Sequence, residues 1–161
     1  MIIRQANAKD REAILEIYRI ARDFMAKNGN PTQWGTFWPP EDLVDEDLRL
    51  GRNYVAEEEN EAVGVFVCLF GEDAEPGYRT IDGAWKAAGP YAVIHRIAVK
   101  RHGEGIAPFI LEETFRKFGH VRIDTHADNH PMRAVLEKLG YTYCGQITVR
   151  DGSLRRAYEK F

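Results

Sequence analysis

Two glycines, Gly103 and Gly105, lie between an apolar run and an amphipathic stretch, and this order could form a phosphate-binding loop. Glycine lets the backbone approach a phosphate, and the unpaired N–H groups and dipole of the following helix favour an anion. The loop reads HGEGIA. It lacks a third glycine, an N-terminal parallel unit and the Walker lysine, so neither a dinucleotide fold nor a P-loop is expected. A plain tight turn is the alternative interpretation.

The elements around this loop follow from hydrophobic periodicity. Tyr91–Val99, YAVIHRIAV, predicts a buried strand, and helical spacing after the glycines continues to about Phe118. Residues 121–126 predict another strand, and residues 131–139 predict a short helix closed by Gly140. The sequence therefore predicts a strand, helix, strand, helix succession with the glycine loop at its first turn.

The other elements are predicted with the same rules. A strand at residues 2–5 leads into a long helix whose apolar positions run from Ala13 to Met25, and a second helix is expected at 41–50. Hairpins are expected from 53–57 with 62–70 and from 141–150 with 154–161, the latter around Asp151-Gly152. The segments 27–40 and 71–90 predict loops, the second with one possible strand at 78–81.

Composition limits the classes of protein that the chain can belong to. With 161 residues, 44% hydrophobic and 29% charged, it fits one globular domain spanning 1–161. The 22 Lys+Arg and 25 Asp+Glu are mixed along the chain, which disfavours nucleic acid as a partner. Cys68 and Cys144 fit reduced core thiols of a cytoplasmic protein, and no signal segment or membrane span is predicted.

The segment 94–111, IHRIAVKRHGEGIAPFIL, resembles the acetyl-CoA-binding core of the GNAT superfamily of N-acetyltransferases. In that family an Arg/Gln-x-x-Gly-x-Gly/Ala loop follows a strand that ends in valine, and it wraps the pyrophosphate. Here His102, Gly105 and Ala107 occupy the three motif positions. His102 stands where Arg or Gln is usual, and the link from the strand to the glycines is shorter than common.

Two downstream segments extend the resemblance. Residues 128–132, DNHPM, and 137–141, EKLGY, are similar to the family's Asn-x-x-Ala and Lys-x-Gly-Phe elements. The resemblance implies an α/β (α+β) fold with a mixed, mostly antiparallel central sheet of about seven strands. It also implies a splayed parallel pair of strands within that sheet and about four flanking helices.

The resemblance further implies acetyl-CoA as co-substrate and no metal. The pantetheine arm would add to the first strand of the parallel pair as an extra pseudo-strand. Asn129 would contact this arm or cap the helix after it, and Glu104 would place an anion beside the pyrophosphate. The implied donor-binding residues are Ile97, Ala98, Val99, His102, Gly103, Glu104, Gly105, Ile106, Ala107, Asn129 and Met132.

Direct attack on a thioester needs a neutral amine, so a group must accept a proton. His95 lies four residues before Val99, where many family members carry a glutamate, and it could act directly or through water. The alternative is a core histidine with a structural hydrogen bond. Asp124 and His126 share a strand face and form a second candidate pair, again with a structural hydrogen bond as the alternative. The position of the family's frequent tyrosine acid is Leu136, so no acid is assigned.

Aromatic and acidic residues of the two loops are candidates for binding the acceptor. Tryptophan is enriched at binding surfaces, and a carboxylate can attract an ammonium group. The alternative is a lid that packs on the protein's own core or on a second subunit of a homodimer. The candidates are Trp34, Phe37, Trp38, Tyr78 and Trp85 as an apolar wall, with Asp82, Glu41 or Asp42 as the anion.

The function that the resemblance implies is transfer of an acetyl group from acetyl-CoA to a primary amine of a small molecule or peptide. A non-catalytic acyl-CoA-binding or sensor domain would keep the loop without turnover. An interaction module that uses the tryptophan-rich loop would bind no CoA. The sequence identifies neither the acceptor nor the oligomeric state.

Overall fold

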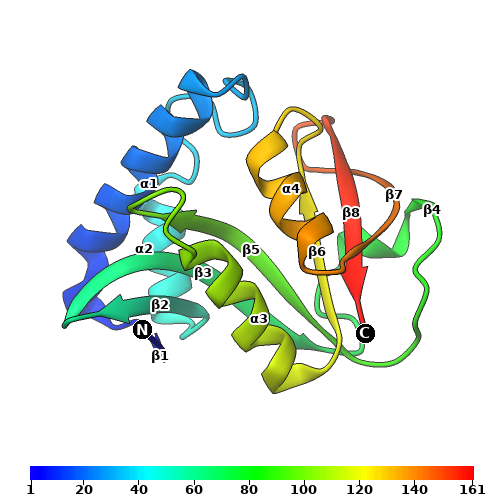
Figure 1. Cartoon of the computed structure of the whole chain (residues 1–161), viewed down its shortest axis with the longest axis horizontal. Coiled ribbons are helices and arrows are strands. Elements are labelled where there is room, and N and C mark those ends of the chain that lie inside the picture. Colours follow the sequence, from blue (N-terminus) through cyan, green and yellow to red (C-terminus); the bar gives the residue numbers. More distant parts are fainter. The chain divides into compact units, whose positions relative to one another are not determined.

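The computed structural model describes every residue, 1–161, and contains one eight-stranded sheet in the order β1-β2-β3-β5-β6-β8-β7-β4 (Figure 1). The pair β5–β6 is parallel, and the pairs β1–β2, β2–β3, β6–β8, β7–β8 and β4–β7 are antiparallel. This confirms the expected mixed sheet with four α-helices; the strand beyond the expected seven is a two-residue one. The elements are β1 (Ile2–Gln5), the 3-10 helix η1 (Ala8–Asp10), α1 (Arg11–Lys27), α2 (Glu41–Arg49), β2 (Asn53–Glu58), β3 (Glu61–Gly71), the 3-10 helix η2 (Pro76–Arg79), β4 (Asp82–Gly83), β5 (Tyr91–Val99), α3 (Ile106–Phe118), β6 (Val121–Thr125), α4 (His130–Lys138), β7 (Thr142–Thr148) and β8 (Leu154–Lys160).

The chain divides into two compact units. The first contains residues 1–68 and 95–110, and the second contains residues 69–94 and 111–161. Strand β5 contributes its second half to the first unit and its first half to the second.

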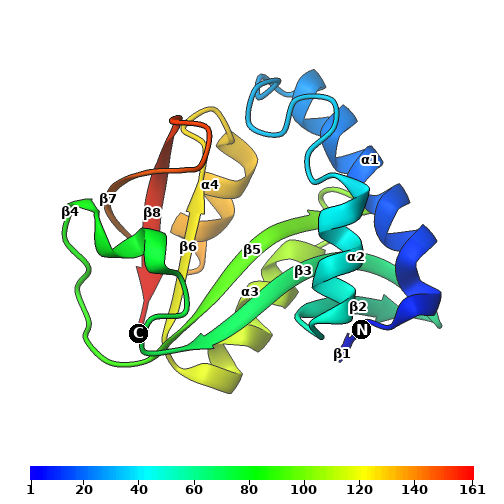
Figure 2. The same cartoon turned by 180° about the vertical axis from the view of Figure 1, so that it is seen from behind.

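The first unit buries the apolar stripe of α1 against α2 and the sheet. The stripe recurs at helical spacing because every third or fourth side chain shares a face. Its members Ile14, Ile17, Tyr18 and Ala21 pack with Val44 of α2, with Val55 and Val65 of β2 and β3, and with Ala98 of β5. The start of α3 covers the other face, where a Cβ on Gly64 would come within 2.9 Å of Ile106 (Figures 1 and 2). Two helices on one face and one on the other therefore fix the second half of β5.

The second unit packs α4 on one face of β6 and β8, and η2 with its following loop on the other (Figures 1 and 2). The η2 side is a core of Tyr78, Tyr91, Val93, Ile147 and Ala157. The possible strand at 78–81 within the expected loop does not form, because Pro76–Arg79 is a 3-10 helix and β4 follows at Asp82–Gly83. Proline starts such a helix well, and the Glu75 side chain caps it by accepting from the Gly77 N–H.

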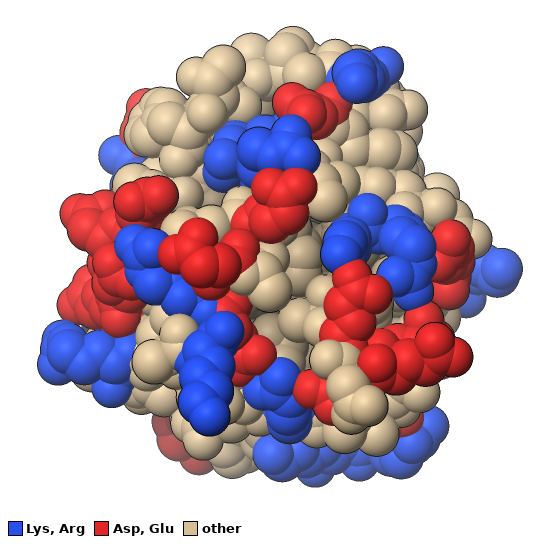
Figure 3. Space-filling model, turned by 90° about the vertical axis from the view of Figure 1, so that its left-hand side faces the viewer, with Lys and Arg blue, Asp and Glu red and all other residues tan.

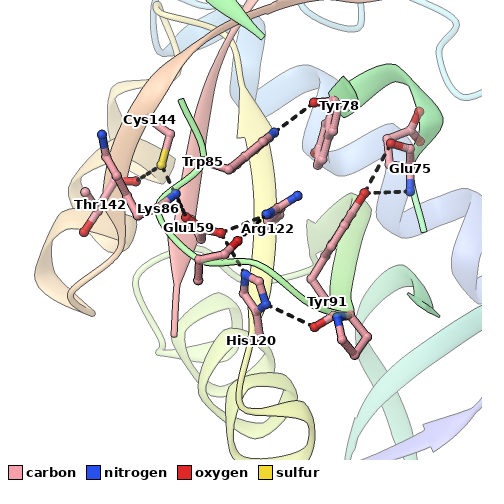
Figure 4. Close-up of polar contacts among 12 residues, drawn as sticks. Glu75, Tyr78, Trp85, Lys86, Tyr91, His120, Arg122, Thr142, Cys144 and Glu159 are labelled. Atoms are coloured by element: carbon pink, nitrogen blue, oxygen red, sulfur yellow. Dashed lines mark hydrogen bonds and ion pairs between the residues drawn. The ribbon is translucent and has the colours of Figure 1, made fainter. Parts of the chain in front are cut away.

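A buried ionic cluster crosses the second unit (Figure 4). The Glu159 side chain has no exposed surface, and its carboxylate accepts hydrogen bonds from Arg122 Nε at 3.0 Å and the Lys86 N–H at 2.6 Å. His120 Nε2 lies 2.7 Å from the same carboxylate, and Cys144 Sγ lies 3.8 Å away. Of this cluster, sequence analysis singled out only Cys144, as a core thiol. The cluster connects β6, β7 and β8 to the loop before β5.

The surface carries both signs of charge. Lys and Arg side chains are interspersed with Asp and Glu on the face shown in Figure 3, in keeping with their mixture along the chain. None of the helices combines the length and the apolar character needed to cross a membrane. No group of three or more His, Cys, Asp and Glu side chains could hold a metal ion.

Candidate functional site

The loop between β5 and α3 has the backbone geometry of an open anion cradle. Gly103 and Gly105 have φ angles of +81° and +79°, in the left-handed region where a side chain is strained. An added Cβ at either glycine would meet no other atom within 4 Å, so both backbones face open space. Helix α3 begins at the next residue, Ile106, and its first N–H groups have no carbonyl partner within the helix. A pyrophosphate therefore fits the donors and the space present here.

The charges of this loop are paired locally. Arg101 donates from Nε to Glu104 at 2.5 Å and from Nη2 to Glu58 at 2.6 Å. Lys100 pairs instead with Glu61. The carboxylate of Glu104 is thus partly neutralised by the neighbouring guanidinium, which reduces its repulsion of a bound anion.

His102 lies against the C-terminal turn of α1. Its imidazole stacks on the Phe24 ring with the centroids 3.5 Å apart and the planes at 2°. Desolvation in this contact lowers the pKa of His102 below its ordinary value of 6.5, which favours the neutral ring at pH 7. An arginine at this motif position would carry a positive charge, whereas the ring of His102 stacks on α1.

Strand β5 contains one residue with a left-handed backbone, Arg96, whose φ is +50°. Such a conformation in a residue other than glycine costs on the order of 1–3 kcal/mol and occurs mainly where the surroundings enforce it. His95 precedes this residue, and Ile97 follows it at the start of the segment implied to bind the pantetheine. The irregularity therefore lies between the candidate base and the candidate donor-binding strand.

Two helices hold Arg96. The Tyr18 hydroxyl of α1 donates to the Arg96 carbonyl oxygen at 3.0 Å, and burial raises the pKa of Tyr18 so that this proton is retained. Asp47 of α2 accepts two hydrogen bonds from the Arg96 guanidinium, at 2.9 and 3.1 Å, and its side chain is 1% exposed. Sequence analysis missed both contacts. The available signal was an Asp at helical spacing from Leu43 and Val44 on an apolar helix face, matched by an Arg inside an apolar strand.

In the second unit, Asp124 and His126 have different partners. The Tyr78 hydroxyl donates to Asp124 Oδ2 at 2.6 Å, and the Asp128 N–H donates to His126 Nδ1 at 3.0 Å. Because Nδ1 accepts, neutral His126 carries its proton on Nε2. The structural hydrogen bonds considered as alternatives are thus present for both residues.

Asn129 caps α4. Its side-chain oxygen accepts from the Met132 N–H at 3.3 Å, and a proline occupies the first turn. Asn129 is 9% exposed and Met132 is half-buried. The capping role is therefore present in this chain.

The aromatic residues expected to bind the acceptor are mainly used inside their own units. Trp34 is 8% exposed in the core of the first unit and meets Tyr18 edge-on, and Trp38 packs on the same core. In the second unit Tyr78 is 2% exposed, and Trp85 Nε1 donates to its carbonyl at 2.8 Å. The exposed candidates are Phe37, at 68%, with Glu41, Asp42 and Asp82.

Comparison with known proteins identifies the family. The model of the acetyltransferase (GNAT) family matches residues 14–141. A GNAT-family acetyltransferase from Streptococcus agalactiae 2603 is 31% identical with a TM-score of 0.87, and the match covers 99% of this chain and 94% of that chain. A search of curated protein sequences finds no match. The chain belongs to the GNAT acetyltransferase family.

More distant structures share the fold. A putative acetyltransferase from Staphylococcus aureus Mu50 is 24% identical, with a TM-score of 0.68 and coverage of 99% of this chain and 98% of that chain. A ribosomal-protein-alanine N-acetyltransferase from Brucella melitensis is 21% identical, with a TM-score of 0.60 and coverage of 100% and 99%. The eight-stranded mixed sheet is therefore that of GNAT acetyltransferases.

Proposed function

We propose that this protein transfers an acetyl group from acetyl-CoA to a primary amine. The observation that carries the proposal is the open two-glycine loop at the start of α3, in a chain that belongs to an acetyltransferase family. One structure with the same fold, at 12% identity and a TM-score of 0.61, is a NatC complex bound to a Gag peptide and CoA. It supports CoA as a molecule that this fold can bind.

The donor would be held mainly by backbone groups. The N–H groups of Gly103, Gly105 and Ile106 would hydrogen-bond the pyrophosphate, and the dipole of α3 would favour its charge. The backbone of Ile97 and Val99 would pair with the pantetheine amides as a strand pairs with a neighbour. Side-chain identity at position 102 then matters little, which is consistent with a histidine there.

In the reaction, the lone pair of a neutral amine attacks the thioester carbonyl carbon. A C–N bond forms, the C–S bond breaks, and the electron pair of that bond leaves on the CoA sulfur as a thiolate. The amine nitrogen loses one proton to a base. The thiolate takes up a proton from the protonated base or from water, so the products are an N-acetylated amine and the free thiol of CoA.

We assign the base first to His95. His95 lies on β5 directly before the left-handed residue, in the strand that would hold the donor.

The donor half is tested by calorimetric titration of acetyl-CoA into the wild type and Gly105→Val. A β-branched side chain at a φ of +79° strains the loop and fills the open side of the cradle, so binding should be lost. Gly152→Val is the matched control, because Gly152 has a φ of +81°, equally open surroundings and a place in the β7–β8 turn. Absence of binding to folded wild type would reject both the enzyme and the sensor interpretations.

The base is tested by His95→Ala. Removing a general base costs about 10²- to 10⁴-fold in turnover, whereas affinity for acetyl-CoA should stay close to that of the wild type. The ascending limb of the pH-rate profile should shift or disappear. Full turnover with an unchanged profile would move the assignment to Asp124 and His126, and binding of acetyl-CoA with no turnover on any amine would favour the sensor domain.

A further inference from the structure

The left-handed residue of β5 is an arginine, although glycine would adopt that backbone without strain. Residues held in such conformations persist when their surroundings over-determine them, and they gather at functional sites. The contacts around Arg96 meet this description, since its carbonyl oxygen and its guanidinium are each held by a different helix.

We propose that Asp47 and Tyr18 are positioning residues that hold the turn of β5 at Arg96, and that this turn sets the directions in which His95 and Ile97 leave the strand. The proposal rests on the proposed function, because the directions of His95 and Ile97 affect turnover only in a protein that transfers an acetyl group. Asp47 and Tyr18 act through the strand and are not catalytic residues.

The hydrogen bonds to the guanidinium and to the carbonyl oxygen of Arg96 both depend on direction. The bidentate contact with Asp47 fixes the plane of the guanidinium as well as its distance. The Tyr18 hydroxyl fixes the orientation of the peptide group that follows residue 96. A side chain and a carbonyl of the same residue are thus anchored, which restrains the backbone rotation between them.

Asp47 is itself fixed. It is 1% exposed, its Oδ1 also accepts from Arg52 Nε at 2.5 Å, and it lies on the face of α2 whose Val44 packs in the core. A buried carboxylate held in this way cannot move with the strand, so the backbone of β5 has to adopt a conformation that keeps Arg96 in contact with Asp47. Helix α2 therefore fixes the position of β5 at Arg96.

A turn of this kind changes which side chains share a face. In a regular strand, His95 and Ile97 would point to one side and Arg96 to the other. Irregular residues in strands disturb that alternation and re-aim neighbouring side chains, commonly beside active sites. Loss of the turn would therefore misdirect the candidate base and the donor-binding backbone together.

The first test separates the backbone from the ion pair. Arg96→Gly and Arg96→Val both remove the guanidinium, but glycine accepts a φ of +50° and valine does not. Since a misplacement of about 1 Å can cost about 10²-fold in rate, kcat of the valine variant should fall at least about ten-fold below that of the glycine variant. Equal kcat values in two folded variants would overturn the proposal.

The second test uses rescue, in case the valine variant does not fold. Asp47→Asn should lower kcat by about ten-fold or more, and adding Arg96→Gly should restore much of it, because glycine needs no external hold on its backbone. A merely stabilising ion pair would instead lower Tm in Asp47→Asn and leave kcat unchanged, and that result would overturn the proposal. Asp45→Asn is the matched control, since Asp45 also lies on α2 and pairs with an arginine, but it is exposed, its partner is Arg11 of α1, and kcat should stay unchanged.

A readout without turnover separates this proposal from the proposed function. The three-bond HN–Hα coupling and the Cα chemical shift of residue 96, with the ring shifts of His95, should change in Asp47→Asn. They should stay as in the wild type in Asp45→Asn. Unchanged values in Asp47→Asn would overturn the positioning role. A wild type that acetylates no amine would instead reject the proposed function, and the spectra would still decide the role of Asp47.

Discussion

Replacing Glu159 by glutamine removes the single anion of the buried cluster and little of its volume. The imidazole of His120 lies between two acceptors, with Nδ1 3.0 Å from the Pro90 carbonyl and Nε2 2.7 Å from the carboxylate. A carbonyl oxygen only accepts, so Nδ1 donates to it. Arg122 donates to the same carboxylate. Glu159→Gln therefore leaves the buried guanidinium of Arg122 without its anionic partner.

The size of the effect follows from the number and burial of these contacts. Burial alone would raise the pKa of Glu159, but hydrogen bonds from His120, the Lys86 N–H and Arg122 together lower it below the ordinary value of 4.5. Removing one partner of a buried ion pair costs about 3–5 kcal/mol. Arg122 keeps the Ala87 carbonyl at 2.8 Å and lies over the Trp85 and Tyr91 rings at 4.4 and 4.2 Å. These remaining partners set the expected loss near the lower limit, about 3 kcal/mol.

The assay is urea and thermal unfolding of the wild type and Glu159→Gln. In a domain of this size about 1 kcal/mol shifts Tm by about 2–4 °C, so a loss of about 6–12 °C is expected at pH 7. Glu16→Gln is the matched control, because Glu16 forms an exposed pair with Arg19 and should change stability by less than about 1 kcal/mol.

The pH dependence of stability tests the contribution of Glu159 independently. The folded-state pKa of Glu159 is depressed, so its contribution is complete above the unfolded value of about 4.5 and is lost as pH falls through the folded pKa. The difference between the wild type and Glu159→Gln should therefore be full at pH 7 and shrink below pH 4.5. A difference equal to that of Glu16→Gln, or one that does not change with pH, would refute this account of the cluster.

Three further variants and one chemical probe test other parts of the structure. Glu104→Gln should tighten acetyl-CoA binding about two- to five-fold, by removing an anion near the start of α3; calorimetry that finds equal or weaker binding would place this carboxylate away from the pyrophosphate. Burial and a neighbouring carboxylate raise the pKa of Cys144 to about 11, so iodoacetamide at pH 7 should modify half-buried Cys68 well before Cys144, and comparable rates would contradict the described core. Trp34→Ala truncates a core side chain and should destabilise the protein by about 3–5 kcal/mol. Phe37→Ala changes a side chain that is 68% exposed, so it should keep Tm and raise KM for the amine. A raised KM with unchanged Tm in Trp34→Ala would reverse the roles of these two residues.

The elements with strong periodicity could be predicted from sequence. The apolar run Tyr91–Val99 forms β5 with the expected bounds, and the stripe from Ala13 to Met25 lies within α1. The glycine pair also stands where a turn before a helix needs positive φ angles. The sequence predicts these elements because apolar residues recur in each of them with the spacing of its buried side chains.

Other features depend on partners distant in the chain. The Tyr78 side chain is buried by β5, β7 and β8, so its segment resembles a strand in composition while its proline and glycine favour a 3-10 turn. Trp34 fills the core of the first unit, although tryptophan in a polar loop also fits an exposed binding wall. The contact of Asp47 with Arg96 joins residues 49 positions apart, and no local rule specifies it. Long-range packing decides these cases, and one sequence does not encode them as a pattern.

Acetyl transfer itself is tested most directly by measuring both products of one reaction. Wild-type protein is incubated with acetyl-CoA and a panel of primary amines: polyamines, amino acids, aminoglycosides, and peptides with free N-termini or lysines. The free CoA thiol is then quantified together with the N-acetylated amine by mass spectrometry. We expect at least one amine to yield the two products in equal amounts, with neither formed above background in Gly105→Val. Acetyl-CoA binding without amine-dependent thiol release across the panel would contradict the proposed function.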